Sequence, residues 1–174
     1  MLGFYEGFPE NIHRIESFTS SLSSKKLQQR LIQVLHEINR KTFSFEEITH
    51  PSVPECTIIF EVGIADATSF NYIDEEETKR VLNALKKEPF QVMDLFCAVR
   101  YYKIRLEKKT PLKFDYYMIR AVFGKNVMEM RVFHERGLRY ISPEDIITFL
   151  VNKINEASAR KILKRFETLN ERYM

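Results

Sequence analysis

The chain has 174 residues, 44% of them hydrophobic and 29% charged, which is enough for one domain with a buried core. Five glycines and six prolines exclude the collagen-like and low-complexity classes. No apolar run approaches the ~20 residues of a membrane span, and residues 1–13 lack the basic region of a signal peptide. These features predict a cytoplasmic protein that does not enter a membrane.

Charge is distributed unevenly along the chain. Residues 1–88 carry 10 basic and 14 acidic side chains, a net charge of −4, whereas residues 89–174 carry 17 and 10, a net charge of +7. Such asymmetry is typical of a protein that binds nucleic acid or another acidic partner, or of two halves that attract each other within one fold. We favour the second interpretation.

The first third of the chain predicts one strand, one loop and one helix. Residues 2–8 are aromatic and are followed by Pro9, which suits a short edge strand. Serines dominate residues 17–24, which favours a loop that ends in a helix cap. Apolar residues then recur with the helical period, so residues 24–41 are expected to form an amphipathic helix whose buried stripe is Leu27, Leu31, Val34, Leu35 and Ile38.

A buried strand and a second helix follow in the middle of the chain. Residues 56–64 are rich in β-branched side chains and lie between proline-containing and polar segments, as a buried strand does. Asp74 and Glu77 have the spacing of a helix-capping pair, and Pro89 prevents the helix from continuing.

The next segment is expected to form a sheet. Three runs rich in Tyr, Phe, Val and Ile lie between about residues 95 and 136, separated by polar turns at 108–111 and 124–126. Runs of this kind pair antiparallel across short turns, so they predict a three-stranded meander.

The last segment is expected to be helical. Ser142 precedes Pro143 and two carboxylates, which is a preferred helix start. An apolar stripe continues towards the end, so residues 143–172 are expected to form one long helix or a helix pair that is a candidate for association. The chain as a whole, residues 1–174, is predicted to be a single α+β domain in which a mainly antiparallel sheet packs against amphipathic helices.

The predicted elements also indicate a set of core residues. Each member lies on the apolar side of its element: Val34, Leu35, Ile58, Phe60, Val99, Val122, Val132, Ile147 and Leu150.

No motif for catalysis, cofactor binding or metal binding is complete. His36 and Glu37 begin a zinc-protease pattern, but Arg40 stands where the second histidine would be. The glycines match neither nucleotide-binding fingerprint. Cys56 and Cys97 lie too far apart for a metal or redox pair and are expected to be buried free thiols. We therefore predict no catalytic residue, no cofactor and no metal.

The most informative region for binding runs from Arg100 to Arg139. It contains 11 basic side chains, four carboxylates and seven tyrosines or phenylalanines. Basic residues interleaved with aromatic rings on a sheet can bind single-stranded nucleic acid.

The predicted turns also set a register for this region. They place Tyr102 opposite Tyr117 and Tyr117 opposite Phe133, on the face of the sheet away from the core. Arg100 and Arg131 would flank these rings. Such a row is too apolar to remain in water, so these five residues are the candidate binding site.

Three functional hypotheses follow. The first is a non-catalytic interaction domain that forms a homo-oligomer, in the simplest case a dimer, or binds a protein partner through this aromatic face or the last helix. The second is a nucleic-acid-binding module that uses the same face. The third is an enzyme without a recognisable motif, with His134 or Asp94 as its reactive group.

Overall fold

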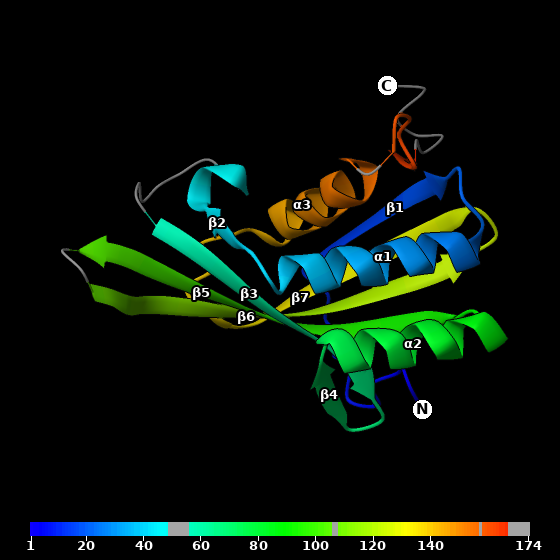
Figure 1. Ribbon diagram of the computed structural model, residues 1–174, viewed down its shortest axis with the longest axis horizontal. Coiled ribbons are helices and arrows are strands. Elements are labelled where there is room, and N and C mark those ends of the chain that lie inside the picture. Colours follow the sequence, from blue (N-terminus) through cyan, green and yellow to red (C-terminus); the bar gives the residue numbers. More distant parts are fainter. Residues whose placement is uncertain (49–55, 106–107, 157, 167–174) are drawn as a thin grey trace.

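The computed structural model describes residues 1–48, 56–105, 108–156 and 158–166 (Figure 1). These ranges contain one eight-stranded antiparallel sheet and three α-helices, so the predicted α+β fold is confirmed. The strands are β1 (Arg14–Ser20), β2 (Thr42–Ser44), β3 (Cys56–Asp66), β4 (Ser69–Tyr72), β5 (Val92–Arg105), β6 (Lys108–Gly124), β7 (Val127–Gly137) and β8 (Leu163–Arg165). The helices are α1 (Ser24–Ile38), α2 (Glu75–Lys87) and α3 (Pro143–Glu156), with a short 3-10 turn at Phe45–Glu47.

The sheet has the strand order β2-β3-β5-β6-β7-β1-β8, and β4 pairs with the end of β3. The predicted meander is present as the three long central strands β5, β6 and β7. All three helices lie on one side of the sheet (Figure 1). The sheet therefore has one face covered by helices and an opposite face that no helix of the described residues covers.

The helix starts follow from their capping residues. The Ser23 hydroxyl accepts a hydrogen bond from the Lys26 amide at the start of α1. The Asp74 carboxylate accepts from the Glu77 amide at 2.8 Å, which confirms the predicted cap of α2. The Ser142 hydroxyl accepts from the Asp145 amide at 3.0 Å, which confirms the predicted cap of α3.

Two predictions for the start of the chain are wrong. Residues 14–20, which overlap the serine-rich segment expected to be a loop, form β1, whose later side chains alternate between exposed and buried positions. This alternation places Phe18 in the core and leaves Ser17 exposed. Residues 2–8, expected to form a strand, make only isolated bridges from Leu2 to Asp66 and from Tyr5 to Ala67.

The prediction of continuous helix near the end of the chain is also wrong. α3 ends at Glu156, and Leu163–Arg165 form β8 beside β1. The apolar residues Ile162 and Leu163, expected in a helical segment, are instead buried at this sheet edge. Residues 167–172 of the predicted helical segment lie outside the described residues.

Three amide side chains bind the main chain of a distant residue through both its N–H and its C=O. In each pair the amide oxygen accepts from the N–H and the amide nitrogen donates to the C=O, at distances between 2.7 and 3.1 Å. The pairs are Gln28 with Phe90, Asn39 with Val62 and Asn155 with Leu163. Each amide acts as a strand partner where no strand is present.

The core between the sheet and the helices matches the predicted set closely. Of the predicted residues, only Val122 is not fully buried, because it lies on the other face of β6. Cys97 is a buried free thiol, and burial raises its pKa to about 12. The side chain of Cys56 lies outside the described part of the structure. No helix of the described residues is long and apolar enough to cross a membrane.

Candidate binding face

The face of the sheet opposite the helices carries a continuous row of aromatic rings. Phe70 of β4, Phe96 of β5, and Tyr116 and Phe114 of β6 lie with successive ring centroids 5.6, 5.3 and 4.8 Å apart. We call these four residues the aromatic stripe and this side of the sheet the uncovered face. Tyr5 extends the row, with its ring centroid 4.7 Å from that of Phe70. The stripe thus crosses from β4 to β6 without a break.

The sequence produces the stripe by strand alternation. Phe114 and Tyr116 are two residues apart in β6, so both rings lie on the same face. Ala98 of β5 pairs with Tyr116, and Gly63 of β3 pairs with Tyr72. These small residues leave a shallow hollow of about 360 Å³ beside the stripe, lined by Glu61, Val62, Gly63, Phe70, Tyr72, Phe96, Ala98, Arg100 and Tyr116.

The arginines of the uncovered face are paired with carboxylates. Three pairs occur: Arg100 with Glu61 at 3.5 Å, Arg120 with Asp94 at 2.7 Å, and Arg131 with Glu129. The pair of Arg120 and Asp94 is bidentate, and the carboxylate is fully buried. The cations that the sequence placed near the rings are therefore largely neutralised within the face.

The buried ion pair also holds residues 1–8 against this face. The Tyr5 amide donates to Asp94 Oδ2 at 2.8 Å, and the Arg120 guanidinium lies 4.3 Å from the centre of the Phe8 ring. A guanidinium over an aromatic ring is attracted by the negative face of the ring. The start of the chain thus covers one end of the uncovered face and leaves the aromatic stripe as its open part.

Four of the five predicted site residues lie on the uncovered face: Arg100, Tyr102, Arg131 and Phe133. The fifth, Tyr117, is fully buried on the helix-covered face, so its predicted placement is wrong. Tyr117 pairs with Cys97, whereas Tyr102 pairs with Pro111. The reason is that the predicted turn at 108–111 is part of β6, which changes the register and turns β6 over.

The predicted row of rings is consequently absent. The Phe133 ring stacks on His13 with centroids 4.8 Å apart instead of meeting another ring of the sheet. Sequence reasoning missed all four members of the aromatic stripe. The signal that could have found them is the spacing of Phe114 and Tyr116, together with the same spacing of Phe70 and Tyr72, because each pair must share one face of its strand.

The reactive groups suggested for an enzyme are engaged in internal contacts. Asp94 is held by Arg120 and Tyr5. His134 Nε2 lies 2.8 Å from Asp115 Oδ1, and the Tyr101 hydroxyl donates to Asp115 Oδ2 at 2.6 Å. Burial is the main cause that raises the pKa of Tyr101.

Asp115 is the centre of this second cluster. Its carboxylate also accepts hydrogen bonds from the Arg139 and Tyr140 amides. Each Asp115 oxygen therefore has two partners, and the cluster joins β5, β6 and β7 to the segment that leads into α3. Within the described residues, no group of three or more His, Cys, Asp or Glu side chains could hold a metal ion.

Comparisons with known proteins leave the function to be argued from these surfaces. No family model, no curated protein and no solved structure matches the chain.

Proposed function

We propose that the protein is a cytoplasmic, non-catalytic interaction domain that forms a dimer through its uncovered face. The observation that carries this proposal is the aromatic stripe, an unbroken row of rings on a face that no helix of the described residues covers. Phe114 is 41% exposed and Tyr72, beside the stripe, is 47% exposed. Contiguous exposed rings of this kind mark interaction surfaces.

The pairing of the arginines favours a protein partner over nucleic acid at this face. A phosphate would have to compete with Glu61 for Arg100 and with Glu129 for Arg131. Phosphate contacts supply most of the affinity for nucleic acid, and they need cations that are free. An apolar face with neutralised charges instead fits a second sheet, which packs at about 10 Å face to face.

The charges beside the stripe suit a second copy of the same chain. Glu61 and Arg100 lie at the edge of the hollow, 43% and 44% exposed, and are only 3.5 Å apart. In a two-fold symmetric dimer each patch meets its own copy, so a face must carry both signs of charge to be self-complementary. The hollow beside the stripe also offers space for a ring of the other subunit.

The test is the native mass of the purified protein and of a Tyr116→Glu variant. Tyr116 is half-buried within the stripe, so a carboxylate there would be desolvated in the dimer but hydrated in the monomer. Sedimentation velocity should show two copies for the wild type and one for the variant, with an unchanged circular dichroism spectrum.

Leu138→Glu is the matched control, because Leu138 is an exposed apolar residue that follows β7 and lies outside the stripe. It should sediment as the wild type does. The dimer should also persist in high salt, since its contacts are mainly apolar. A wild-type monomer at all concentrations, or a Tyr116→Glu dimer, would contradict the proposal.

A further inference from the structure

We propose that a second surface, around β8, binds single-stranded nucleic acid. This surface, the β8 groove, lies between α3 and β8 and continues past β8 towards the end of β1. It is separate from the uncovered face, and the inference does not depend on the proposed dimer.

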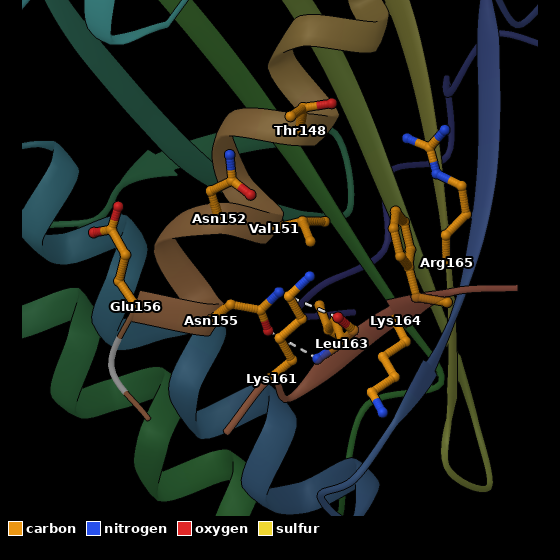
Figure 2. Close-up of a pocket in the computed structure, with 10 residues that line it drawn as sticks. Thr148, Val151, Asn152, Asn155, Glu156, Lys161, Leu163, Lys164 and Arg165 are labelled. Atoms are coloured by element: carbon orange, nitrogen blue, oxygen red, sulfur yellow. Dashed lines mark hydrogen bonds between the residues drawn. The ribbon is translucent and has the colours of Figure 1, made fainter. Parts of the chain in front are cut away.

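The β8 groove consists of two adjoining hollows. The first, of about 690 Å³, lies between α3 and β8 (Figure 2). The second, of about 620 Å³, lies between the start of β8 and residues 19–21. Both are lined by Lys161 and Lys164, so the same cations serve both hollows. A linear ligand with several anionic groups could therefore lie along both.

The cations of the groove differ from those of the uncovered face. Arg160, Lys161 and Lys164 are exposed, and none has a carboxylate oxygen within 4.0 Å among the residues that the structure describes. Glu156, the carboxylate that lines the first hollow, is paired with Lys153. The unpaired cations of the basic half thus gather here, where phosphate groups would find them free.

The walls of the first hollow offer groups that suit nucleobases. Its apolar part includes Val151 and Leu163, and α3 presents Thr148 and Asn152 above it (Figure 2). Both polar side chains are exposed and have no hydrogen-bond partner within the described part of the chain. A hydroxyl and an amide can donate to and accept from base edges.

An exposed ring stands at the end of the groove. Phe166 directly follows β8, its amide is fixed to the Ser17 carbonyl at 2.8 Å, and its side chain is 47% exposed. Free cations beside an exposed ring are typical of sites for single strands, in which phosphates contact the cations and a base stacks on the ring. Duplex bases are already stacked and could not reach the ring.

The shape of the groove fits neither a membrane surface nor a purely protective role for its lysines. An anionic membrane would need apolar side chains that project towards it, whereas Val151 and Leu163 are buried in the groove. Lysines on an edge strand also discourage pairing with other chains, and this role alone requires no ligand. It accounts for Lys164 in β8, but not for Arg160 and Lys161 before the strand or for the hollows beside them.

The test is fluorescence anisotropy with a labelled oligothymidylate of about 20 nucleotides, longer than one typical site. The logarithm of the binding constant should fall with the logarithm of the salt concentration with a slope of about −2, as expected for three phosphate contacts on a single strand. The double variant Lys161→Glu, Lys164→Glu should weaken binding at least tenfold at low salt and flatten this slope. Phe166→Ala should weaken binding about tenfold with little change in slope.

The control carries the same change of net charge at another place. Lys79→Glu with Lys87→Glu alters two exposed lysines of α2 and should leave the affinity within about twofold of the wild type, with only the long-range effect of net charge. Equal loss in both double variants would overturn the proposal, because binding would then follow net charge. It would also be overturned if the wild type failed to bind the oligonucleotide, whether or not it bound phosphatidylserine vesicles.

Discussion

At the scale of single residues, Asp115 has the most partners among the buried carboxylates. It is fully buried, and its two oxygens accept from the Tyr101 hydroxyl and from two main-chain amides and also contact the His134 ring. Gly137 makes this arrangement possible, since it has a φ of +115° and a Cβ there would lie 2.5 Å from Asp115 Oδ1. The end of β7 is therefore shaped around one side chain.

We predict that Asp115→Ala lowers the free energy of unfolding by about 3 kcal/mol or more, because several buried donors lose their acceptor at once. Urea denaturation followed by circular dichroism measures the change. Glu135→Ala on the exposed part of β7 is the control and should stay within about 0.5 kcal/mol of the wild type. An equally small effect of Asp115→Ala would show that its bonds contribute no net stability.

His13 gives the protein a defined dependence on pH. Burial, with the nearby Arg139 and His134, lowers its pKa from 6.5. Its Nδ1 accepts from the His134 amide at 2.9 Å, which requires that this nitrogen carry no proton. The folded state therefore favours neutral His13 more than the unfolded state does.

The stability that this preference contributes is complete above pH 6.5 and is lost as the pH falls through 6.5 towards the lower pKa of the folded state. An NMR titration of the His13 ring should have its midpoint below 6.5. His13→Gln should remove the corresponding part of the stability change over this range. A midpoint above 6.5 would reverse the sign of the effect and contradict the prediction.

At the scale of secondary-structure elements, the sequence predicted helices better than strand register. Capping residues and apolar stripes are local signals, so the starts of α2 and α3 were found to the residue. The register of β5 and β6 depends on where the connection between them lies, and a polar Lys-Lys-Thr-Pro segment does not distinguish a turn from a strand. One wrong turn placed Tyr117 on the wrong face and hid the aromatic stripe.

β1 and β8 were missed for a different reason. Their residues are polar or have helical spacing, and they become strands only because β7 offers an edge to β1 and β1 offers one to β8. Tertiary pairing thus overrides local propensity. The β8 groove depends on both strands, so the sequence alone could not indicate it, although the basic residues that line it were visible.

The orientation of α1 can be tested with Leu35→Ala. Leu35 is fully buried among residues of the sheet and of α3. Truncation should lower the free energy of unfolding by roughly 2 to 5 kcal/mol, through lost burial and a residual cavity. Gln33→Ala, on the exposed side of the same helix, is the control and should have little effect in the same denaturation experiment.

The cap of α3 has a smaller expected effect. Ser142→Ala removes the acceptor of the Asp145 amide, and the loss of an N-cap costs ~1 kcal/mol. Ser142→Asp keeps an acceptor at this position and should restore most of the stability in the same urea titration. If alanine and aspartate gave equal midpoints, the cap would have no measurable role.

At the scale of the whole molecule, the two faces of the sheet have opposite environments. One is dry beneath three helices, and the other is closed only at one end by residues 1–8, which the Asp94–Arg120 pair holds in place. The net positive charge of the second half is not spread evenly over these surfaces. Ion pairs neutralise it on the uncovered face, whereas it is free at the β8 groove.

We predict that Arg120→Met detaches residues 1–8 from the sheet. The variant leaves Asp94 buried without its partner, so the free energy of unfolding should fall by about 3 to 5 kcal/mol. Hydrogen exchange at the Tyr5 amide should become faster than in the wild type. Arg131→Met, which breaks a more exposed pair, should leave this exchange rate unchanged.

The amide side chains that bind main chain have a consequence for how copies of this protein can accumulate. Asn39 occupies the outer edge of β3 between the short strands β2 and β4, and Asn155 occupies part of the outer edge of β8. An incoming strand would find only brief stretches of open hydrogen-bonding groups at either side of the sheet. Growth into filaments by strand addition is thereby discouraged, so association through a face can end in a closed pair instead of an open fibre.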